Sequence, residues 1–229
     1  MLPSRDEEAN LPRVVPDALR AAGEIARIVE VLIVDDGSRD RTHAIAGELA
    51  GADTRVRVLR HDASRGYGAA LRTGFSAATS EWVFYTDSDG QFDLDDLRAL
   101  PELLQDCDVV VGYRVRRQDP WLRCLGGWCW TRVVNVAFGL HLRDADCAFK
   151  IFPRAFLATT ELSSTGALIS AELVARARGR GLRVEQLAVR HRPRLFGKPS
   201  GAHPRVVARA LRELFLLRAR IRAAVSSRA

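Results

Sequence analysis

Three oxygen-bearing side chains stand at alternate positions near the middle of the chain: Asp87, Asp89 and Gln91, within YTDSDGQFDLDD. Alternate residues of an extended segment share one face, so we expect these side chains to point the same way. Two carboxylates and an amide oxygen form a hard, all-oxygen donor set that suits Mg²⁺ or Mn²⁺. The oxygens of a diphosphate would fill the open coordination positions. The alternative is a polar turn in which Asp93 or Asp95 caps a following helix.

A second acidic pair, Asp35 and Asp36, precedes Gly37 and Ser38. A carboxylate here could accept hydrogen bonds from a nucleotide base or ribose, or it could hold a turn and a helix start together. We expect one aspartate to be structural and the other to bind. A glycine-rich run at residues 66–74 resembles a phosphate loop at a helix N-terminus, but tight packing of that helix explains it as well, and we assign it no phosphate contact.

Runs rich in β-branched residues alternate with helical patterns. The predicted strands are Glu30–Asp35, Arg55–Arg60, Glu81–Thr86, Asp108–Tyr113 and Arg183–His191. The predicted helices are Leu11–Ala22, Arg41–Ala50, Gly68–Ala78, Leu94–Gln105 and Ile169–Arg178. This alternation predicts a mostly parallel sheet, in which ligands bind at the carboxyl ends of the strands. Both acidic clusters and Arg114 directly follow predicted strands, so we expect them to meet at one edge of the sheet.

Positive charge is concentrated at the C-terminal end. The chain carries a net charge of +7, and residues 202–229 hold seven arginines against one glutamate, which leaves +1 for residues 1–201. Apolar residues recur in this tail with helical spacing, and Arg205, Arg209 and Arg212 fall on another face, so we expect a basic amphipathic C-terminal helix. It could lie on an anionic membrane surface, cover the sheet or dock a membrane partner protein. Nucleic-acid binding would rest on charge alone and is not expected.

An apolar stretch contains Trp121, Trp128 and Trp130 beside Arg123 and Arg132. Tryptophan with arginine is typical of helices at a membrane interface, and the alternative is core packing of a helical subdomain. We expect neither a bilayer-spanning segment nor a signal peptide. The four cysteines form no metal-ligand pattern and indicate a reducing compartment. We therefore expect a cytoplasmic protein held peripherally on the cytoplasmic face of the membrane.

Seven segments, in order, resemble motifs of the inverting family-two glycosyltransferases of GT-A fold, in the branch of dolichyl-phosphate mannose synthase and the polyprenyl-phosphate glycosyltransferases. They are LPSRDEEANLP, VLIVDDGSRDRT, RGYGAALRTGF, YTDSDGQFDLDDL, VVVGYR, DADCAFKIF and RPRLFGKPSG, and they cover roughly residues 2–201. The resemblance implies one Rossmann-like α/β domain over residues 1–201 and a metal-dependent enzyme that uses a UDP- or GDP-sugar donor. No Q-x-x-R-W motif is present, which argues against a processive polysaccharide synthase.

The resemblance also implies roles for particular residues. The pocket for the base and ribose would be lined by Pro3, Arg5, Glu7, Val34 and Asp36. The metal and the donor diphosphate would be held by Asp87, Asp89 and Gln91. Donor or acceptor phosphates would be met by Arg114 and Arg194, and the segment beside the acceptor contains Asp144, Phe149 and Lys150. The candidate catalytic residues among these are Asp89, Arg114 and Asp144.

Four features depart from the family pattern. The family's first strand normally precedes the proline at Pro3, and only Met1 and Leu2 stand there, so we expect either a start further upstream or the loss of one edge of the nucleotide pocket. The other departures are Arg5 in place of an aromatic residue, Asp6 in place of an asparagine, and Ser200 in place of a lysine.

The acceptor decides whether a general base is needed. A sugar hydroxyl needs one within hydrogen-bond reach, whereas a phosphate monoester, with its second pKa near about 6, is already mostly dianionic at neutral pH. The candidate bases are Asp144, Asp146 and Glu172, and Glu172 is equally typical of an ordinary helix face. Because no clear base stands out, we expect a polyprenyl-phosphate acceptor. The alternatives are a soluble glycan, protein or natural-product acceptor and, in another class, a catalytically silent nucleotide-binding or scaffold protein.

Overall fold

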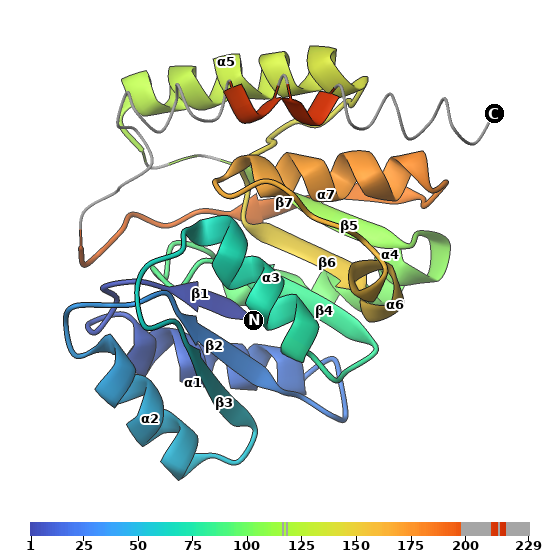
Figure 1. Ribbon diagram of the computed structural model, residues 1–229. Helices are drawn as coiled ribbons and strands as arrows, with labels where there is room; N and C mark the ends of the chain where they lie inside the picture. Colours follow the sequence, from blue (N-terminus) through green and yellow to red (C-terminus); the bar gives the residue numbers. More distant parts are fainter. Residues whose placement is uncertain (116, 118, 198–211, 215, 219–229) are drawn as a thin grey trace.

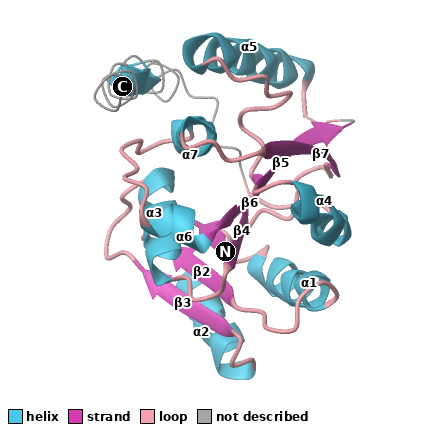
Figure 2. Ribbon diagram, turned by 90° about the vertical axis from the view of Figure 1, so that its right-hand side faces the viewer, coloured by secondary structure: helices cyan, strands magenta, loops and turns pink. Residues whose placement is uncertain are grey.

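The computed structural model describes residues 1–115, 117, 119–197, 212–214 and 216–218. A central sheet is covered by helices on both faces, with α3 and α6 on one side and α1 and α4 on the other (Figures 1 and 2). The strands are β1 (Leu2–Ser4), β2 (Val31–Asp35), β3 (Val56–Arg60), β4 (Trp82–Thr86), β5 (Val109–Val115), β6 (Phe149–Pro153) and β7 (Val184–Arg190). The α-helices are α1 (Leu11–Gly23), α2 (Thr42–Ala52), α3 (Tyr67–Ala77), α4 (Leu100–Asp106), α5 (Trp121–Phe138), α6 (Arg154–Ala158) and α7 (Leu168–Gly179), and a 3₁₀ helix, η1, spans Leu94–Ala99.

The first residue of the chain joins two halves of the sheet. One half is β1-β2-β3, all parallel; the other is β4-β6-β5-β7, in which β5 and β7 are parallel and β6 runs antiparallel to both its neighbours. The Met1 amino group donates to Phe84 O at 2.8 Å, and Thr86 N donates to Met1 O at 3.2 Å. The described strands therefore run in the order β3-β2-β1-β4-β6-β5-β7, with only β6 reversed. The prediction of a mostly parallel sheet is confirmed.

All five predicted strands are present, with ends that differ from the prediction by at most two residues. Two short strands were not predicted. The first is β1, in which Pro3 lies opposite Val34 in register with β2. The second is β6, whose apolar run is interrupted by Lys150. Both lie in the interior of the sheet, where hydrogen bonding on two sides supports strands that are too short to stand out by pattern.

The predicted helix over Leu94–Gln105 is two elements, the 3₁₀ helix η1 followed by α4. Pro101 stands in the first turn of α4 and has no N–H to donate to the preceding turn, which favours a break between η1 and α4 at this point. The side chain of Asp93 accepts a hydrogen bond from Asp95 N at 3.2 Å and caps η1. The expected polar cap is therefore present, with Asp93 in that role.

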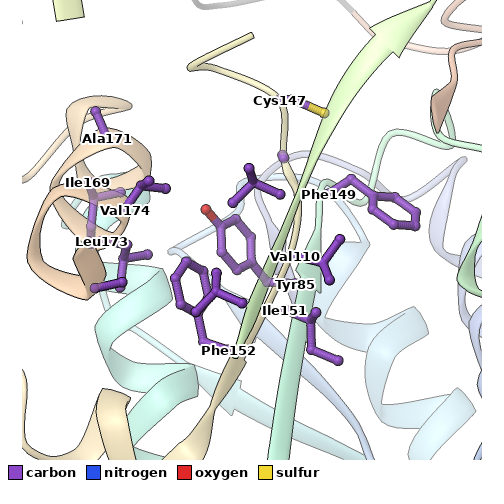
Figure 3. Close-up of a cluster of buried hydrophobic side chains, with 14 of the residues drawn as sticks. Tyr85, Val110, Cys147, Phe149, Ile151, Phe152, Ile169, Ala171, Leu173 and Val174 are labelled. Atoms are coloured by element: carbon purple, nitrogen blue, oxygen red, sulfur yellow. The ribbon is translucent and has the colours of Figure 1, made fainter. Parts of the chain in front are cut away.

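The main core lies between the second half of the sheet and α7. Phe152 points toward Leu173 of α7, whereas Phe149 and Ile151 point to the opposite face of β6, as alternation along a strand requires (Figure 3). The hydroxyl of Tyr85 is 3.0 Å from Ser170 Oγ, which satisfies both polar groups inside the core. This core fixes β4, β5 and β7, whose carboxyl ends carry the candidate site.

In both ribbon views α5 lies at the top of the molecule, away from most of the strands (Figures 1 and 2). Within it, only Thr131 and Val134 are buried, and the exposed large apolar side chains share one face of the helix: Trp121, Leu122, Leu125, Trp128, Val133 and Val136. Arg132 covers the ring of Trp128 at 5.3 Å. The core-packing alternative does not hold for this face, which includes two of the three tryptophans. No helix in the described part of the chain combines the length and apolarity needed to cross a membrane.

Only part of the predicted C-terminal helix falls among the described residues. Residues 212–214 and 216–218 are helical, with Leu214 and Leu217 buried and Arg212 exposed. The two other arginines of the predicted basic face, Arg205 and Arg209, lie outside the described residues. An amphipathic character is therefore visible over these two turns, and the basic face as a whole stays a prediction.

Candidate active site at the carboxyl ends of the strands

The acidic segment after β4 forms a turn, not the extended strand that the alternating pattern predicted. Gly90 is left-handed, with φ +72°, a conformation that glycine adopts without steric cost. Asp89 Oδ1 accepts a hydrogen bond from Gln91 N at 3.1 Å, which closes the turn. The prediction that the three side chains share one extended face is therefore wrong. Asp87 and Asp89 nevertheless lie close enough for their charges to repel.

Asp87 and Asp89 form an acidic site whose charge is only partly offset by the protein's own cations: Arg114 and Lys150 act on Asp87, and Arg194 donates to Asp89. Burial raises the pKa of Asp87 to about 7, and the neighbouring Asp89 carboxylate adds to the rise. Tyr67 OH donates to Asp87 Oδ1 at 3.0 Å. A divalent cation would replace the proton that this environment favours and would offset the repulsion between the two carboxylates. The residues present therefore fit Mg²⁺ or Mn²⁺.

Completing such a site requires ligands beyond these two side chains. Among the described residues, no group of three or more His, Cys, Asp and Glu side chains could hold a metal ion. Gln91 donates through Nε2 to Arg192 O at 3.2 Å, which leaves its oxygen Oε1 to serve as the third predicted ligand. Mg²⁺ sites of this kind are commonly completed by water and by substrate phosphates.

Arg194, which follows β7, connects the acidic turn to the loop after β1. Its Nη1 donates to Asp89 Oδ2 at 3.1 Å and its Nη2 donates to Glu7 Oε1 at 2.6 Å. All three side chains are largely buried, with 18%, 11% and 10% of the Arg194, Asp89 and Glu7 side chains exposed. Asn10 Nδ2 donates to the other Glu7 oxygen at 2.5 Å. The fold thus brings together three predicted site residues from the ends of three strands.

Asp36 lies deeper and is surrounded by donors from one loop. Its oxygens accept hydrogen bonds at 2.6–2.9 Å from His61 Nδ1, Ser64 Oγ, Arg65 N and Gly66 N. Burial opposes ionisation of Asp36, but these donors together outweigh it and lower the pKa of the carboxyl. In this structure Asp36 anchors the 61–66 loop to β2. A direct contact with a base or ribose stays a prediction.

The other predicted pocket residues occupy different depths. Val34 is fully buried, and its Cγ2 faces Gly74 of α3, so the structure does not bring this side chain to the acidic edge. Pro3 is buried opposite Val34, and its carbonyl accepts from Ser88 Oγ at 2.9 Å, which ties β1 to the acidic turn. Arg5 is exposed and donates to Ser64 Oγ at 2.6 Å. Of these three residues, only Arg5 is exposed.

Arg114 and Asp144 form a second buried ion pair. Arg114 Nε donates to Asp144 Oδ2 at 2.6 Å and Nη2 donates to Asp144 Oδ1 at 2.8 Å, a two-point contact that fixes both side chains. Burial would raise the pKa of Asp144, but the contact with Arg114 outweighs it and lowers that pKa. Lys150 is fully buried in β6, and its Nζ donates to the carbonyls of Ala145 and Cys147. Lys150 therefore supports the 144–147 loop from inside.

A family model described as glycosyl transferase family 2 matches residues 1–160. The chain belongs to this family. The match contains the acidic turn, Asp35 and Asp36, and the Arg114–Asp144 pair, whereas Arg194 lies outside it.

Related proteins align with large parts of this chain. A polyprenol monophosphomannose synthase of Mycolicibacterium smegmatis is 29% identical over 90% of this chain and 82% of its own length. An undecaprenyl-phosphate 4-deoxy-4-formamido-L-arabinose transferase of Aeromonas hydrophila is 31% identical over 67% of this chain. The match covers 48% of that relative, so the chain spans about half the length of the first curated relatives it matches.

A solved structure shares the fold. Glucosyl-3-phosphoglycerate synthase from Mycobacterium tuberculosis, in complex with UDP, aligns with a TM-score of 0.68 at 20% identity, over 93% of this chain and 78% of that chain. A complex of the same enzyme with Mn²⁺, UDP-glucose and phosphoglyceric acid aligns with a TM-score of 0.67 at 19% identity, over 93% of this chain and 78% of that chain. The likeness confirms the predicted GT-A fold.

The three candidate bases of this family-two chain differ in their surroundings. Asp144 is committed to Arg114. Glu172 is fully buried and accepts hydrogen bonds from Ser163 N, Ser164 N and Arg176. It is therefore not an ordinary solvent-facing residue of the helix, and it is not free to take a proton. Asp146 is half-buried, and burial, with the nearby Asp144 charge, raises its pKa to about 6.

Two residues that support the site were not singled out from the sequence. Tyr67, at the start of α3, holds Asp87, and its position in the glycine-rich run was the only signal. Gly68 allows that helix to approach the 164–165 loop: its N–H donates to Thr165 O at 2.9 Å, and a side chain there would collide with Ser164 O. The packing interpretation of residues 66–74 is therefore confirmed. The second residue that the sequence did not single out is His61, which is buried between Asp36 and Thr73.

Proposed function

We propose that this chain transfers a sugar from a UDP- or GDP-sugar donor to a polyprenyl phosphate, with inversion at the anomeric carbon. Membership of glycosyl transferase family 2 supports the reaction class. The acceptor class is supported by two relatives, an undecaprenyl-phosphate 4-deoxy-4-formamido-L-arabinose transferase and a polyprenol monophosphomannose synthase.

The chain's own residues would hold the donor at the carboxyl ends of the strands. Asp87 and Asp89 would hold the divalent ion, and Arg194 would supply a planar guanidinium that suits a phosphate oxygen pair. Glu7, which pairs with Arg194, would contact the nucleoside. A bound Mg²⁺ or Mn²⁺ supplies neutralisation of the charge that develops on the departing diphosphate.

One contact carries the proposal of a lipid acceptor: α5 is hydrogen-bonded directly to the loop that contains Asp144. Thr131 Oγ1 accepts from Ala145 N at 3.2 Å. Asn135 exchanges two hydrogen bonds with Leu142, at 2.8 and 3.0 Å. The exposed apolar face of α5 is thus coupled to the candidate acceptor loop. A helix of this kind, with tryptophan and arginine together, fits the interface of a membrane that contains the lipid.

Among the candidate bases near the described site, only Asp146 is free to take a proton. The engagement of the others agrees with a phosphate acceptor. A phosphate monoester oxygen is already anionic at neutral pH and can attack without losing a proton. Asp146, with its pKa raised to about 6, is the one observation that favours the alternative of a hydroxyl acceptor on a glycan or another soluble molecule.

The test is product formation by the full chain. A panel of UDP- and GDP-sugars is incubated with Mn²⁺ or Mg²⁺ and a polyprenyl phosphate in vesicles, and lipid-linked sugar is measured. We expect product from at least one donor, and a fall of about 10²-fold or more in Asp89→Ala. Asp106→Ala, at an exposed position at the end of α4, is the control. Nucleotide binding without sugar transfer to any acceptor would instead support a silent binding protein.

A further inference from the structure

In this structure a side chain of the protein itself occupies the position of a cation at the acidic turn. Asp89 has both oxygens engaged, because Oδ1 accepts from Gln91 N and Oδ2 accepts from Arg194 Nη1. The same guanidinium contacts Glu7 through Nη2, and its Nε donates to Phe196 O at 2.6 Å. A divalent ion that takes Asp89 Oδ2 as a ligand must therefore compete with an arginine already placed there.

The arginine, and not its partners, is the part of this network that can move. Glu7 is held by Asn10 and, through its backbone N–H, by Thr42 Oγ1 at 2.8 Å. By contrast, the two residues that follow Arg194 are open to solvent, with Leu195 62% and Phe196 44% exposed. Displacing the 194–196 segment would disrupt little packed surface, whereas displacing Glu7 would break contacts inside the fold.

We propose that Arg194 is an exchangeable counter-ion. When a divalent ion takes its place, Arg194 moves away from Asp89 and Glu7 and binds the donor diphosphate. This inference rests on the proposed function, because it needs a ligand that carries both phosphates and a metal. Its consequence is that metal and nucleotide diphosphate bind cooperatively. The ion alone must displace Arg194 into solvent, whereas an incoming diphosphate provides the arginine with a new partner.

The scarcity of protein ligands at the turn points the same way. The described residues offer two carboxylates and one amide oxygen, and no larger group of metal-binding side chains. Phosphate oxygens would complete the coordination of the ion while they bind Arg194. Exchange of the arginine and completion of the metal shell are thus coupled events at one site.

The test measures Mn²⁺ binding directly, through the electron paramagnetic resonance signal of free Mn²⁺, with the full chain and without sugar transfer. In the wild type, saturating UDP or GDP should tighten Mn²⁺ binding by about tenfold or more. In Arg194→Gln, Mn²⁺ alone should bind about tenfold tighter than in the wild type, and the nucleotide should add less. Arg192→Gln is the matched control, because Arg192 lies in the same segment but pairs with Asp93 and is 55% exposed.

The outcomes separate this inference from the proposed function. If Mn²⁺ alone binds Arg194→Gln no more tightly than it binds the wild type or Arg192→Gln, the exchange is refuted, while Mn²⁺-dependent binding of UDP or GDP would leave the proposed function standing. If neither nucleotide binds the wild type with Mn²⁺, the proposed function fails and the exchange with it. Should Arg194→Gln not fold, Arg194→Met carries the test: it keeps an unbranched side chain but has no charge to compete with the ion, so it should also bind Mn²⁺ alone more tightly.

Discussion

Single side chains in this protein are held by networks whose members come from distant parts of the chain. Glu172 is an example, since it lies on α7 but stabilises the 163–164 loop through two backbone N–H groups. Burial raises the pKa of such a carboxyl, but here the hydrogen bonds from Ser164, Ser163 and Arg176 prevail and the pKa of Glu172 is lowered. Its charged form is therefore part of the folded structure.

Replacing Glu172 with glutamine should lower the free energy of unfolding by about 1–3 kcal/mol at pH 7, because Arg176 and the loop amides lose a charged acceptor. The folded pKa lies below the usual 4.5, so this stabilisation is complete above that value and disappears as the pH falls through the folded pKa. Urea unfolding between pH 3 and pH 8 measures it. Glu48→Gln, at a carboxylate 69% exposed, should show no such loss; an equal loss at all pH values would contradict the role of the charge.

Asp146 tests the nature of the acceptor at the level of one carboxyl. If the nucleophile is a phosphate, Asp146→Asn should keep lipid-linked product formation within about threefold of the wild type, because no proton must be removed. If the nucleophile is a hydroxyl, the same change should cost about 10²–10⁴-fold in kcat. We expect the first result. Asp144→Asn is the comparison variant, expected to lose activity because it leaves Arg114 without its partner.

The sequence was informative about which residue types gather at the site and less so about what each one contacts. The acidic turn, Glu7 and Arg194 were expected together, and the structure places them together. The anchoring of the 61–66 loop by Asp36 could not be predicted, because the donors to Asp36 lie 25–30 positions further along the chain. Local pattern carries no information on such contacts.

At the scale of elements, the same limit explains which parts of the fold were missed. The parallel strands of five to seven residues stand out in the sequence as runs rich in β-branched and other apolar residues, and their positions were predicted, whereas the three-residue β1 was missed. The antiparallel β6 has five residues with a lysine among them. It forms a strand only because it pairs with neighbouring strands on both sides. The break between η1 and α4 had a local signal, Pro101, which the helical periodicity of the segment outweighed in the prediction.

Helix α5 gives the element-scale prediction. Val136→Asp places a charge in the middle of the exposed apolar face and should reduce binding of the full chain to anionic phospholipid vesicles by about tenfold, because it removes apolar contact and adds repulsion. Ile28→Asp is the matched control: Ile28 is 83% and Val136 79% exposed, and Ile28 lies outside α5. Co-sedimentation with vesicles measures both. Equal loss in the two variants would mean that net charge, not the α5 face, governs binding.

At the scale of the whole molecule, the site brings together residues that follow strands in both halves of the sheet. Glu7 follows β1, Asp89 follows β4 and Arg194 follows β7, so a ligand that binds all three connects the two halves of the sheet. Such a ligand binds the folded state alone, and its binding free energy adds to the stability of the entire domain. The continuity of the sheet through Met1 means that this gain should not be confined to one half.

Thermal unfolding should therefore report the metal-linked site as a single shift. At about 100 times its dissociation constant, a nucleotide diphosphate with Mn²⁺ should add about 2.7 kcal/mol to the free energy of unfolding, which raises Tm by about 5–11 °C in a domain of this size. Circular dichroism and tryptophan fluorescence should give the same midpoint. With EDTA present the shift should fall to a small fraction, and in Asp89→Asn it should be small even with Mn²⁺, because one carboxylate cannot hold the ion against the buried Arg194 charge. A shift of full size in EDTA would mean that the nucleotide is held without a metal, and two separate midpoints would mean that the two halves of the sheet unfold independently.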